Sequence, residues 1–592
     1  MSVKIFEISW EVGNKVGGIH TVLSSKSKYA QMAFGENYYV IGPYLKNKSE
    51  KEFKIYPWPD ELKEISQYFA NKVFYGKWIV EGMPQGFLVD FQSNLKRVNE
   101  IKYFMWEKFR IDSLRSSDDF NEPVAWAYSV YEFLKELFGL EKYKKSLVHV
   151  HEWLAGPVLL FLKQENPNIV SIFTTHATVL GRVLSGAGID FYNFITDINA
   201  DEEAYKYFVE AKHQTEKATA NFADFMTTVS TLTAEEVKYF LKREVDYILP
   251  NGFDLSKFPT FEEIASKHKQ NKRSISEFLL FFFSPYVRQC NLKDAFFIFT
   301  SGRKEIRNKG IDIAIKSVAR VNQIMKENNI FKPIYFFIFV PSQVIDINHE
   351  VLENFTVYRS LEEYISNLGD ELVARIIHHI IHGEEIKLEN IFENEEKLQI
   401  ENIVQSVKRQ SPTPLSTHIL PVNDEIISLL KEVNLTNKES DPVKVIVYPI
   451  YVSAHDGFLN LNYYEAINGM HLGIFPSAYE PWGYTPLESL AAGVMTITSD
   501  TSGFGCYVLN KNLLSKENPG LWILKRRNKE EKAIVEDLAR LLSDILMMPR
   551  KDRIQNKYEA RKLASVFDWK ELYQNYLYLY DLAAKKYEDL LL

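Results

Sequence analysis

Residues 479–488 read Tyr479-Glu480-Pro481-Trp482-Gly483-Tyr484-Thr485-Pro486-Leu487-Glu488 and join an expected strand to an expected helix. The apolar run 470–476 before them predicts a buried parallel strand, and the good helix formers 487–492 after them end at Gly493. Such a loop is where α/β proteins bind phosphates, because free N–H groups and the helix dipole point at it. Glu480 and Glu488 flank the loop and favour a ligand with both hydroxyls and phosphates, such as a sugar nucleotide. An acidic loop before an ordinary helix is the alternative at this point.

Strands and helices alternate in two separate halves of the chain. Apolar strands are expected from Val3 to Trp10, among others, and begin again at Phe296. A charged, strandless segment between the halves, residues 258–276, predicts a linker. We therefore expect an α/β protein with one doubly wound domain over residues 1–260 and another over residues 277–570, with the ligand in the cleft between them.

One helical segment interrupts the second half. Residues 361–410 are polar and strandless, and a long helical excursion inside an α/β domain is more often an interaction or oligomerisation element than a catalytic one. Residues 571–591 form the last expected helix of the chain.

The composition excludes several classes of protein. Of 592 residues, 46% are hydrophobic and 25% charged, as in globular proteins, and a net charge of −8 argues against a nucleic-acid-binding surface. Cys290 and Cys506 are the only cysteines, which excludes a disulfide framework and a cysteine-rich metal site. The N-terminus lacks a secretory pattern, and the densest apolar run, Phe278 to Phe283, is far shorter than the roughly 18 residues of a membrane span. We expect a cytoplasmic protein that binds neither nucleic acid nor membranes.

Three further loops carry residues suited to a phosphate-bearing sugar. Glycines let the backbone approach a ligand closely, and basic or imidazole side chains at strand ends are typical of an active-site edge. The residues are Lys15, Gly17 and Gly18 after the first strand, His176 and Arg182 after the strand at 168–175, and Arg303 to Gly310 after the strand at 296–302. The first of these loops lacks the GxGxxG dinucleotide pattern.

The pair His149-x-His151 raises the question of a metal site. A strand places residues i and i+2 on the same face, so both imidazoles could bind one ion, but no third ligand is evident. We predict no metal ion and no cofactor.

Several long motifs resemble those of the eukaryotic-type glycogen synthases, glycosyltransferase family 3, and the resemblance runs nearly end to end. The motifs are Trp10-Glu11-x-x-Asn14-Lys15-Val16-Gly17-Gly18, Phe74-Tyr75-Gly76-Lys77-Trp78, His151-Glu152-Trp153-Leu154-Ala155-Gly156, Thr174-Thr175-His176-Ala177-Thr178-x-Leu180-Gly181-Arg182, Gly302-Arg303-x-Glu305-x-x-Asn308-Lys309-Gly310, Glu480-Pro481-Trp482-Gly483-Tyr484-Thr485-Pro486, Ser502-Gly503-Phe504-Gly505-Cys506 and Asp568-Trp569-Lys570. The resemblance implies the GT-B fold, with two Rossmann-like domains and a C-terminal helix, 571–592, that packs back on the first. It also implies a retaining transfer of glucose from UDP-glucose to the non-reducing 4-hydroxyl of glycogen or a related α-1,4-glucan.

The resemblance assigns roles to the loop residues. Arg303 and Lys309 would neutralise the departing diphosphate, Glu480 would lie at the glucose of the donor, and His176 would complete the site from the first domain. The donor would also contact Lys15, Gly17, Gly18, Arg182, Trp482, Gly483, Tyr484, Thr485 and Glu488, whereas His151, Glu152 and Asn251 are candidates for the acceptor side of the cleft. Whether Glu480 is a nucleophile stays open. No Asp-x-Asp motif stands beside the site, so the activity is expected to be independent of metal.

The family's regulation and partners supply further expectations. Glucose 6-phosphate is a candidate activator at His268, Lys272, Arg550, Arg553, Lys557 and Arg561, although some arginines of the family are replaced, which removes their bidentate geometry. Residues 361–410 match the region that assembles family members into homotetramers, and a glycogenin-like primer protein is a candidate partner. The alternatives are an ADP-glucose-dependent glucan synthase and a non-catalytic protein that binds glucan or senses sugar phosphates.

Overall fold

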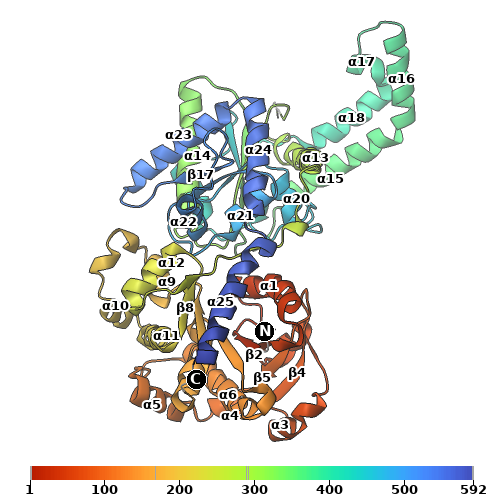
Figure 1. The fold of residues 1–592 in the computed structure, drawn as a ribbon. Coiled ribbons are helices and arrows are strands. Elements are labelled where there is room, and N and C mark those ends of the chain that lie inside the picture. Colours follow the sequence, from red (N-terminus) through yellow and green to blue (C-terminus); the bar gives the residue numbers. More distant parts are fainter. Residues whose placement is uncertain (1–2, 167, 288–289, 291, 590–592) are drawn as a thin grey trace.

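The computed structural model describes all residues except 1–2, 167, 288–289, 291 and 590–592. Figure 1 shows two α/β domains and an arm of helices that projects from the second. Each domain is built on its own mainly parallel sheet, which confirms the predicted fold class. Within the described residues, no helix is long and apolar enough to cross a membrane.

The first sheet has the strand order β3-β4-β5-β2-β1-β6-β7-β8-β9 in the described part of the chain. Its strands are β1 (Lys4–Ile8), β2 (Tyr38–Pro43), β3 (Phe53–Ile55), β4 (Val73–Trp78), β5 (Gln85–Val89), β6 (Ser146–His151), β7 (Val170–Thr175), β8 (Phe225–Thr228) and β9 (Tyr247–Ile248). From β5 to β9 all neighbours are parallel, whereas β4 pairs antiparallel with β3 and β5. Strands β1 and β6 are parallel, so the loops after them open at the same edge, and the order reverses between them, which makes this the switch point of the sheet.

Both faces of this sheet are covered by helices. In β1, Phe6 and Ile8 pack in the core under α6 and α8, while Ile5, like Val3 just before the strand, faces the opposite core, which contains α1 and α25. The helices of the domain are α1 (Gly18–Phe34), α2 (Lys46–Glu52), α3 (Lys63–Tyr68), α4 (Gln92–Leu95), α5 (Val98–Phe109), α6 (Asp118–Gly139), α7 (Glu152–Ala155), α8 (Pro157–Glu165), α9 (Val179–Gly186), α10 (Ala200–Lys206), α11 (Glu210–Phe222) and α12 (Thr231–Glu236), and α25 (Trp569–Asp589) joins them from the C-terminal end of the chain.

The second sheet has the order β14-β11-β10-β15-β16-β17. Its strands are β10 (Phe296–Ser301), β11 (Ile334–Phe339), β14 (Val443–Tyr448), β15 (Leu472–Ile474), β16 (Met495–Ser499) and β17 (Leu521–Leu524), and all of them are parallel. In chain order this is 3-2-1-4-5-6, the arrangement of dinucleotide-binding domains, with its switch point between β10 and β15. The helices around it are α14 (Ile311–Glu327), α19 (Glu425–Glu432), α20 (Tyr463–Asn468), α21 (Tyr484–Ala491), α22 (Gly503–Asn510), α23 (Glu531–Met547) and α24 (Arg550–Ser565).

The expected linker at 258–276 is wrong for most of its length. Residues Ile264–Phe283 form the helix α13, which buries Ile264, Ile275 and the phenylalanines at 278 and 281–283 in the core of the second domain. The charged residues that suggested a linker lie mainly on the other face of this amphipathic helix.

The helical excursion is a projecting arm, as Figure 1 shows. It consists of α15 (His349–Asn367), α16 (Gly369–Ile381), α17 (Leu388–Ile391) and α18 (Asn394–Val407), and the short strands β12 (Asp346–Ile347) and β13 (His418–Ile419) pair antiparallel at its base. The prediction of a helical segment is confirmed, although the helices begin at His349, before the expected boundary.

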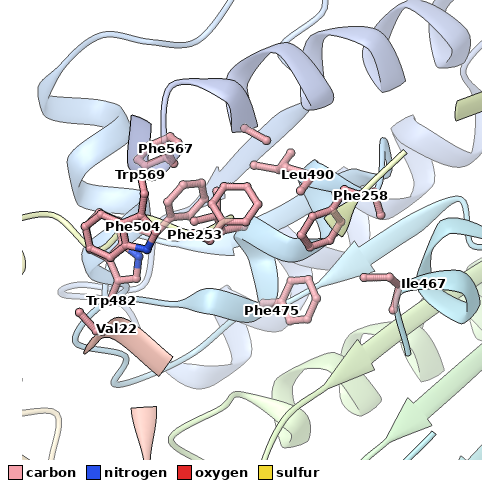
Figure 2. Close-up of a cluster of buried hydrophobic side chains, with 14 of the residues drawn as sticks. Val22, Phe253, Phe258, Ile467, Phe475, Trp482, Leu490, Phe504, Phe567 and Trp569 are labelled. Carbon is pink, nitrogen blue, oxygen red and sulfur yellow. The ribbon is translucent and has the colours of Figure 1, made fainter. Parts of the chain in front are cut away.

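The chain crosses between the domains at two places that lie side by side. The N–H of Phe253 donates to the carbonyl of Phe567 at 3.1 Å, and the N–H of Trp569 donates to the carbonyl of Phe253 at 3.1 Å. Figure 2 shows the side chains of all three in one apolar cluster with Trp482 and Phe504. The two crossings therefore form one hydrogen-bonded hinge under a shared hydrophobic cover.

Candidate active site

The basic loop after β10 and the loop after β15 meet at the switch point of the second sheet. The carbonyl of Asn308 accepts hydrogen bonds from the N–H groups of Ala478 (2.9 Å) and Tyr479 (3.2 Å). This fastening brings Lys309 and Glu480 together, and their side chains form an ion pair in which both are about 15% exposed. A cation and a carboxylate from two loops therefore lie side by side at the switch point.

Two glycines allow these loops to approach so closely. Gly310 has a φ of +69°, and a Cβ there would lie 1.9 Å from the carbonyl oxygen of Pro476. Gly483 has a φ of +117° and is the N-cap of α21, whose first residues are Tyr484 and Thr485. The helix begins at Tyr484, one turn before Glu488, so its free N–H groups face the loop that contains Glu480.

Arg303 is the exposed member of the basic loop. Its side chain is 68% exposed and pairs with Glu305 at 2.8 Å. Lys304, between them, turns to Asp424 at 2.5 Å and does not contact Glu480. Two cations of the loop therefore have different surroundings: Arg303 is exposed to solvent, and Lys309 is paired with Glu480.

Glu488 and Trp482 lie behind the helix start. Burial raises the pKa of Glu488 to about 7, and the hydroxyl of Tyr464 donates to its carboxylate at 3.3 Å. The ring of Trp482 packs against Phe504 and Phe567, so it supports the loop through the apolar cluster of Figure 2. The hydroxyl of Tyr484 donates to the carbonyl of Gly252 next to the hinge, at 3.1 Å.

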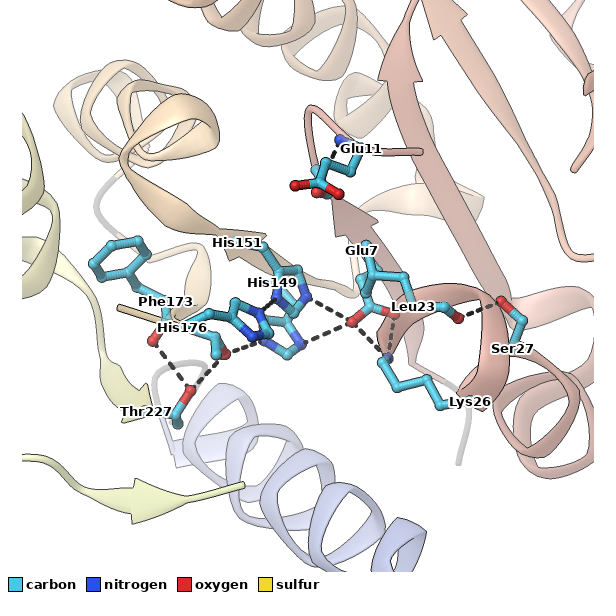
Figure 3. A network of polar contacts seen from close by, with 12 residues as sticks. Glu7, Glu11, Leu23, Lys26, Ser27, His149, His151, Phe173, His176 and Thr227 are labelled. Carbon is cyan, nitrogen blue, oxygen red and sulfur yellow. Dashed lines mark hydrogen bonds and ion pairs between the residues drawn. The ribbon is translucent and has the colours of Figure 1, made fainter. Parts of the chain in front are cut away.

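In the first domain, His176 is held by a buried chain of polar contacts that Figure 3 shows. Its Nε2 lies 3.0 Å from Nδ1 of His151, and Nε2 of His151 lies 2.7 Å from the carboxylate of Glu7. Both oxygens of Glu7 accept from Lys26 at 2.6 Å, and Tyr38 donates to the same carboxylate. Because the Glu7 carboxylate can only accept, the proton of His151 stands on its Nε2 and its Nδ1 is an acceptor. The ring Nε2–H of His176 donates to that Nδ1, so the network sets the tautomer of His176.

Electrostatics in this network follow from burial and pairing. Burial alone would raise the pKa of Glu7, but Lys26 and His151 hold it well below its usual range. Burial lowers the pKa of His176 well below the usual value, and the nearby His151 and Arg182 lower it further. His176 is therefore a neutral imidazole, suited to hydrogen bonding with a sugar hydroxyl rather than to pairing with phosphate.

The same residues answer the question of a metal at His149 and His151. Glu7 supplies the third ligand atom that the sequence pattern did not reveal, and ligand atoms of the three lie within 4.8 Å of one another. Each of these atoms already has a partner, however: His149 contacts Tyr580 and Thr174, and Lys26 occupies both oxygens of Glu7. The donor set is thus organised as a hydrogen-bond network around an ammonium group, which does not fit a metal ion.

The glycine-rich turn after β1 is closed by an acid of its own. The Glu11 carboxylate accepts from the N–H groups of Gly17 and His20, both at 2.8 Å, and so occupies the N-terminus of α1. A Cβ at Gly18 would meet no atom within 4 Å, and Lys15 is exposed. Space for a ligand remains at Gly18, whereas the N–H group of Gly17 is already used by Glu11.

Glu152, the residue after β6, has a strained backbone with a φ of +66°. Its carboxylate accepts from the N–H of His176 at 2.7 Å, and burial raises its pKa. Burial by itself lowers the pKa of Arg182, but the negative charges of Glu152 and, from the second domain, Glu305 raise it. The strained turn therefore places one carboxylate that holds the backbone of His176 and also acts electrostatically on Arg182.

Asn251 lies where β9 leads into the hinge. It is 4% exposed, and its Oδ1 has no hydrogen-bond partner among the described residues. A buried acceptor without a partner suits a ligand hydroxyl.

Two buried acids beneath the His176 turn were not predicted. Glu216 accepts from the Thr175 hydroxyl (2.8 Å) and the N–H of Val179 (2.9 Å), and Glu236 accepts from the hydroxyls of Thr178 (2.5 Å) and, across the domain boundary, Tyr479 (3.3 Å). Burial raises the pKa of Glu216 to about 8 and that of Glu236 to about 7. Both glutamates lie on helices, where a glutamate usually belongs to the solvent-exposed face. The sequence therefore contained no pattern that distinguishes these two as buried.

Glu216→Gln is expected to flatten the loss of stability as pH rises through neutrality toward 8. Because the folded pKa is about 8 and the unfolded value is near 4.5, the folded state binds the proton more tightly between these two values, so stability falls as pH rises from about 5 to about 8 and levels off above that. Between about pH 7 and pH 8.5 this group removes about 1 kcal/mol from the wild-type protein. Urea unfolding of wild type and variant at both pH values measures the difference, and equal slopes would contradict the protonated carboxyl.

Most of the predicted activator residues form a basic cluster where α24 meets α13. Nζ of Lys557 lies 3.1 Å from Nε2 of His268, and Nζ of Lys272 lies 3.4 Å from Nε2 of His471. Burial, Lys272 and Arg553 lower the pKa of Lys557 to about 7, and burial and Lys557 lower that of His268 to about 3. Cations that depress one another in this way favour an anionic ligand.

The remaining two activator residues lie at opposite ends of the same helix. Arg550 is close enough to lower the pKa of Lys272. Arg561 instead donates to the carbonyl of Pro259 at 3.0 Å and stacks over Phe261, so the structure does not bring it into contact with the cluster.

Known proteins share this architecture. The catalytic domain of starch synthase IV from Arabidopsis thaliana, bound to ADP and acarbose, superposes with a TM-score of 0.51 at 14% identity and covers 98% of this chain and 99% of its own. A UDP-forming α,α-trehalose-phosphate synthase from Burkholderia xenovorans gives 0.51 at 10% identity, with both chains covered completely. The two facing α/β domains are those of the GT-B glycosyltransferases.

Sequence comparison narrows this class. Residues 7–589 match the family model described as glycogen synthase. A glycogen [starch] synthase of Neurospora crassa is 33% identical over 98% of this chain and 84% of its own length, and the liver enzyme of Mus musculus is 31% identical over 97% and 82%. The chain belongs to the glycogen synthase family, whose reaction transfers glucose to glycogen.

Proposed function

We propose that the enzyme transfers glucose from UDP-glucose to the non-reducing 4-hydroxyl of glycogen or a related α-1,4-glucan, with retention at the anomeric carbon. The pairing of Lys309 with Glu480 at the switch point of the second sheet carries the proposal. When the donor enters, Lys309 would exchange its carboxylate partner for the diphosphate, and Glu480 would accept from hydroxyls of the glucose. Arg303 and the N–H groups at the start of α21 would take up the charge that develops as the diphosphate leaves.

The first domain would supply the other half of the site. His176, fixed as a neutral imidazole by His151 and Glu7, would orient the glucose, and Arg182 would add a positive charge from across the cleft. Asn251, with its buried acceptor, is proposed for the acceptor side. His151 and Glu152, also candidates for that side, have their polar atoms paired and would act there through His176, which they hold. Glu488 is proposed for the ribose hydroxyls.

Incubation with labelled UDP-glucose or ADP-glucose, glycogen and excess EDTA tests the proposal. Incorporation from UDP-glucose that a glucosidase specific for α-1,4 linkages releases would support it, including the independence from metal. Incorporation only from ADP-glucose would favour the starch synthase-like alternative, and none from either donor would favour a non-catalytic glucan-binding protein.

We propose further that glucose 6-phosphate binds the basic cluster of His268, Lys272, Arg553 and Lys557. The support is the depressed pKa values of these groups, because a phosphate dianion would relieve the repulsion among them. Binding near pH 7.5 should then take up a proton on Lys557, whose pKa rises when the phosphate arrives.

Lys557→Gln is expected to abolish the response to glucose 6-phosphate. Titration of the wild-type enzyme should raise the rate or the affinity for the donor, and the heat of binding should vary with the ionisation enthalpy of the buffer. Lys551→Gln, an exposed lysine on the same helix, is the matched control and should respond as wild type does. A full response in Lys557→Gln would remove this cluster as the site.

The arm is proposed as the element that assembles the enzyme into oligomers. Helix α16 exposes Val373, Ile377, Ile380 and Ile381, each at least 50% accessible, which is an apolar face without a partner in the described chain. Light scattering of the purified enzyme measures the state directly, and a monomer at micromolar concentration would contradict the proposal.

A further inference from the structure

The tip of the arm carries a group of imidazoles that the glucosyl transfer does not use. His378, His379 and Glu384 each offer a ligand atom, and these atoms lie within 4.8 Å of one another at the end of α16. His382 stands beside them, with its ring centroid 4.2 Å from that of His378. Figure 1 shows α16 and α17 at the end of the arm, far from both sheets.

The backbone explains why these residues converge. The N–H of Glu384 donates to the carbonyl of His379 at 3.0 Å, the N–H of Gly383 donates to that of Ile380 at 3.2 Å, and Gly383 has a φ of +67°. This is the Schellman termination of a helix, which folds the chain back over its own last turn. Glu384 is thereby returned to His379, and its carboxylate lies 2.5 Å from Nδ1 of that ring.

The hydrogen bonds leave the nitrogens that a metal needs. Nδ1 of His382 lies 2.8 Å from the carbonyl of His378, to which it donates, so its Nε2 keeps a free lone pair. Nε2 of His379 lies 3.1 Å from the carbonyl of Asn390, which leaves Nδ1 to face Glu384. Histidines that bind metal ions usually donate their other ring N–H to a backbone carbonyl or a carboxylate in this way.

The surroundings hold the tip in place. Arg375 joins α16 to the start of α18 through Glu393 (3.2 Å), Glu396 (2.6 Å) and the carbonyl of Ile391 (3.0 Å). The side chain of Asn390 donates to the carbonyl of Glu385 at 3.2 Å and braces the loop. The carbonyl end of α16 adds a negative potential that attracts a cation.

We propose that His378, His379 and Glu384, with His382 as a fourth ligand, form a Zn²⁺ site at the tip of the arm. Imidazole nitrogens with one carboxylate are a typical zinc donor set. Ligand atoms at about 2.0–2.2 Å from a tetrahedral ion lie about 3.3 Å apart. The distance between Nδ1 of His379 and the Glu384 carboxylate, 2.5 Å, would therefore increase by less than about 1 Å when the ion binds. The exposed His378 would approach the ion by rotation of its side chain. The ion would cross-link the last turn of α16 to the loop that leads into α17.

Titration of the full chain with ZnCl₂, in competition with a chromophoric chelator, tests the site. One equivalent should bind, and Co²⁺ in its place should give the visible absorption of a tetrahedral complex. The double variant His378→Gln/His379→Gln and the single variant Glu384→Gln should each weaken binding by about 100-fold or more. His349→Gln is the matched control, because His349 is exposed and lies 3.4 Å from Asp346 but has no second imidazole nearby among the described residues.

These binding measurements test the zinc site without any assay of glucosyl transfer. His378, Glu384 and His349 are exposed and His379 is partly buried, outside any apolar core, so far-UV circular dichroism should be unchanged in the variants. No zinc bound by the wild-type chain at about 100 µM, where even a weak site of this kind would fill, would overturn the proposal. So would equal affinity in wild type and in the double variant, or loss of affinity in His349→Gln.

Discussion

Replacing Lys309 with methionine is expected to lower kcat/KM for UDP-glucose by about 10³-fold, or about 4 kcal/mol of transition-state stabilisation. In the proposed reaction the departing diphosphate gains negative charge beside the largely buried Lys309, where a single fixed cation contributes more than it would in water. Asn308 holds Lys309 in that place because it fastens the lysine's loop to the loop of Glu480. Steady-state kinetics with glycogen in excess measures the loss.

Lys304→Met is the matched control for this prediction. The two lysines belong to one loop, but the ammonium group of Lys304 pairs with Asp424 on the side of α19. We expect this variant to retain kcat/KM within about tenfold, since it removes no charge from the cleft. Lys309→Arg should recover part of the activity by restoring the charge. A loss of less than tenfold in Lys309→Met would show that Arg303 and the start of α21 neutralise the diphosphate without it.

Lys26→Met is expected to lower the free energy of unfolding by about 3–5 kcal/mol. Lys26 and Glu7 are completely buried and 2.6 Å apart, so the variant leaves a carboxylate in the core without its counter-ion. His151 and Tyr38 still donate to Glu7, but neither carries the compensating charge of an ammonium group. Urea unfolding followed by tryptophan fluorescence measures the change.

Two comparisons separate this effect from the simple loss of a lysine. Lys28→Met, two residues along α1, removes a lysine that is half exposed and 3.5 Å from Glu81, and should cost less than about 1 kcal/mol. The double variant Lys26→Met/Glu7→Gln should recover much of the lost stability, because the uncompensated charge is gone. If the double variant is as unstable as the sum of the two single variants, the pair is not coupled and the argument fails.

The same double variant separates stability from catalysis. Glutamine at position 7 can present either its carbonyl or its amide to His151, so the tautomer of His151, and through it that of His176, is no longer set. We therefore expect the stabilised double variant to have a reduced kcat with a nearly normal KM for glycogen. Nitrogen chemical shifts of the His176 ring report its tautomer directly.

Much of the fold follows from local patterns in the sequence. The apolar runs and their helices predict two parallel sheets, and the rule that loops meet at the switch point places Arg303, Lys309 and Glu480 in one site. The rule identifies which loops converge, but not which atoms pair. That Lys309 contacts Glu480 while Lys304 turns to Asp424 depends on the packing of α19, which no local pattern reveals.

The residues that the sequence did not identify are buried charges. Glu7 stands in the buried strand KIFEI, between the apolar Phe6 and Ile8, and a carboxylate at that position requires a counter-ion. That anomaly was the available signal, but its partner Lys26 lies on a helix and looks like any surface lysine until the fold brings the two together. The linker prediction for residues 258–276 was wrong for the opposite reason. There the charged residues are exposed, and their number concealed the apolar residues that form the buried face of a helix.

The paired crossings at Phe253 and Phe567 have a mechanical consequence. One flexible tether would let the two domains twist, tilt and slide freely, whereas two tethers that are hydrogen-bonded to each other leave a single easy rotation about the line that joins them. Opening and closing of the cleft should then follow one coordinate. Distances between labels attached at several pairs of points across the cleft should all change together, in fixed proportion and at the same rate.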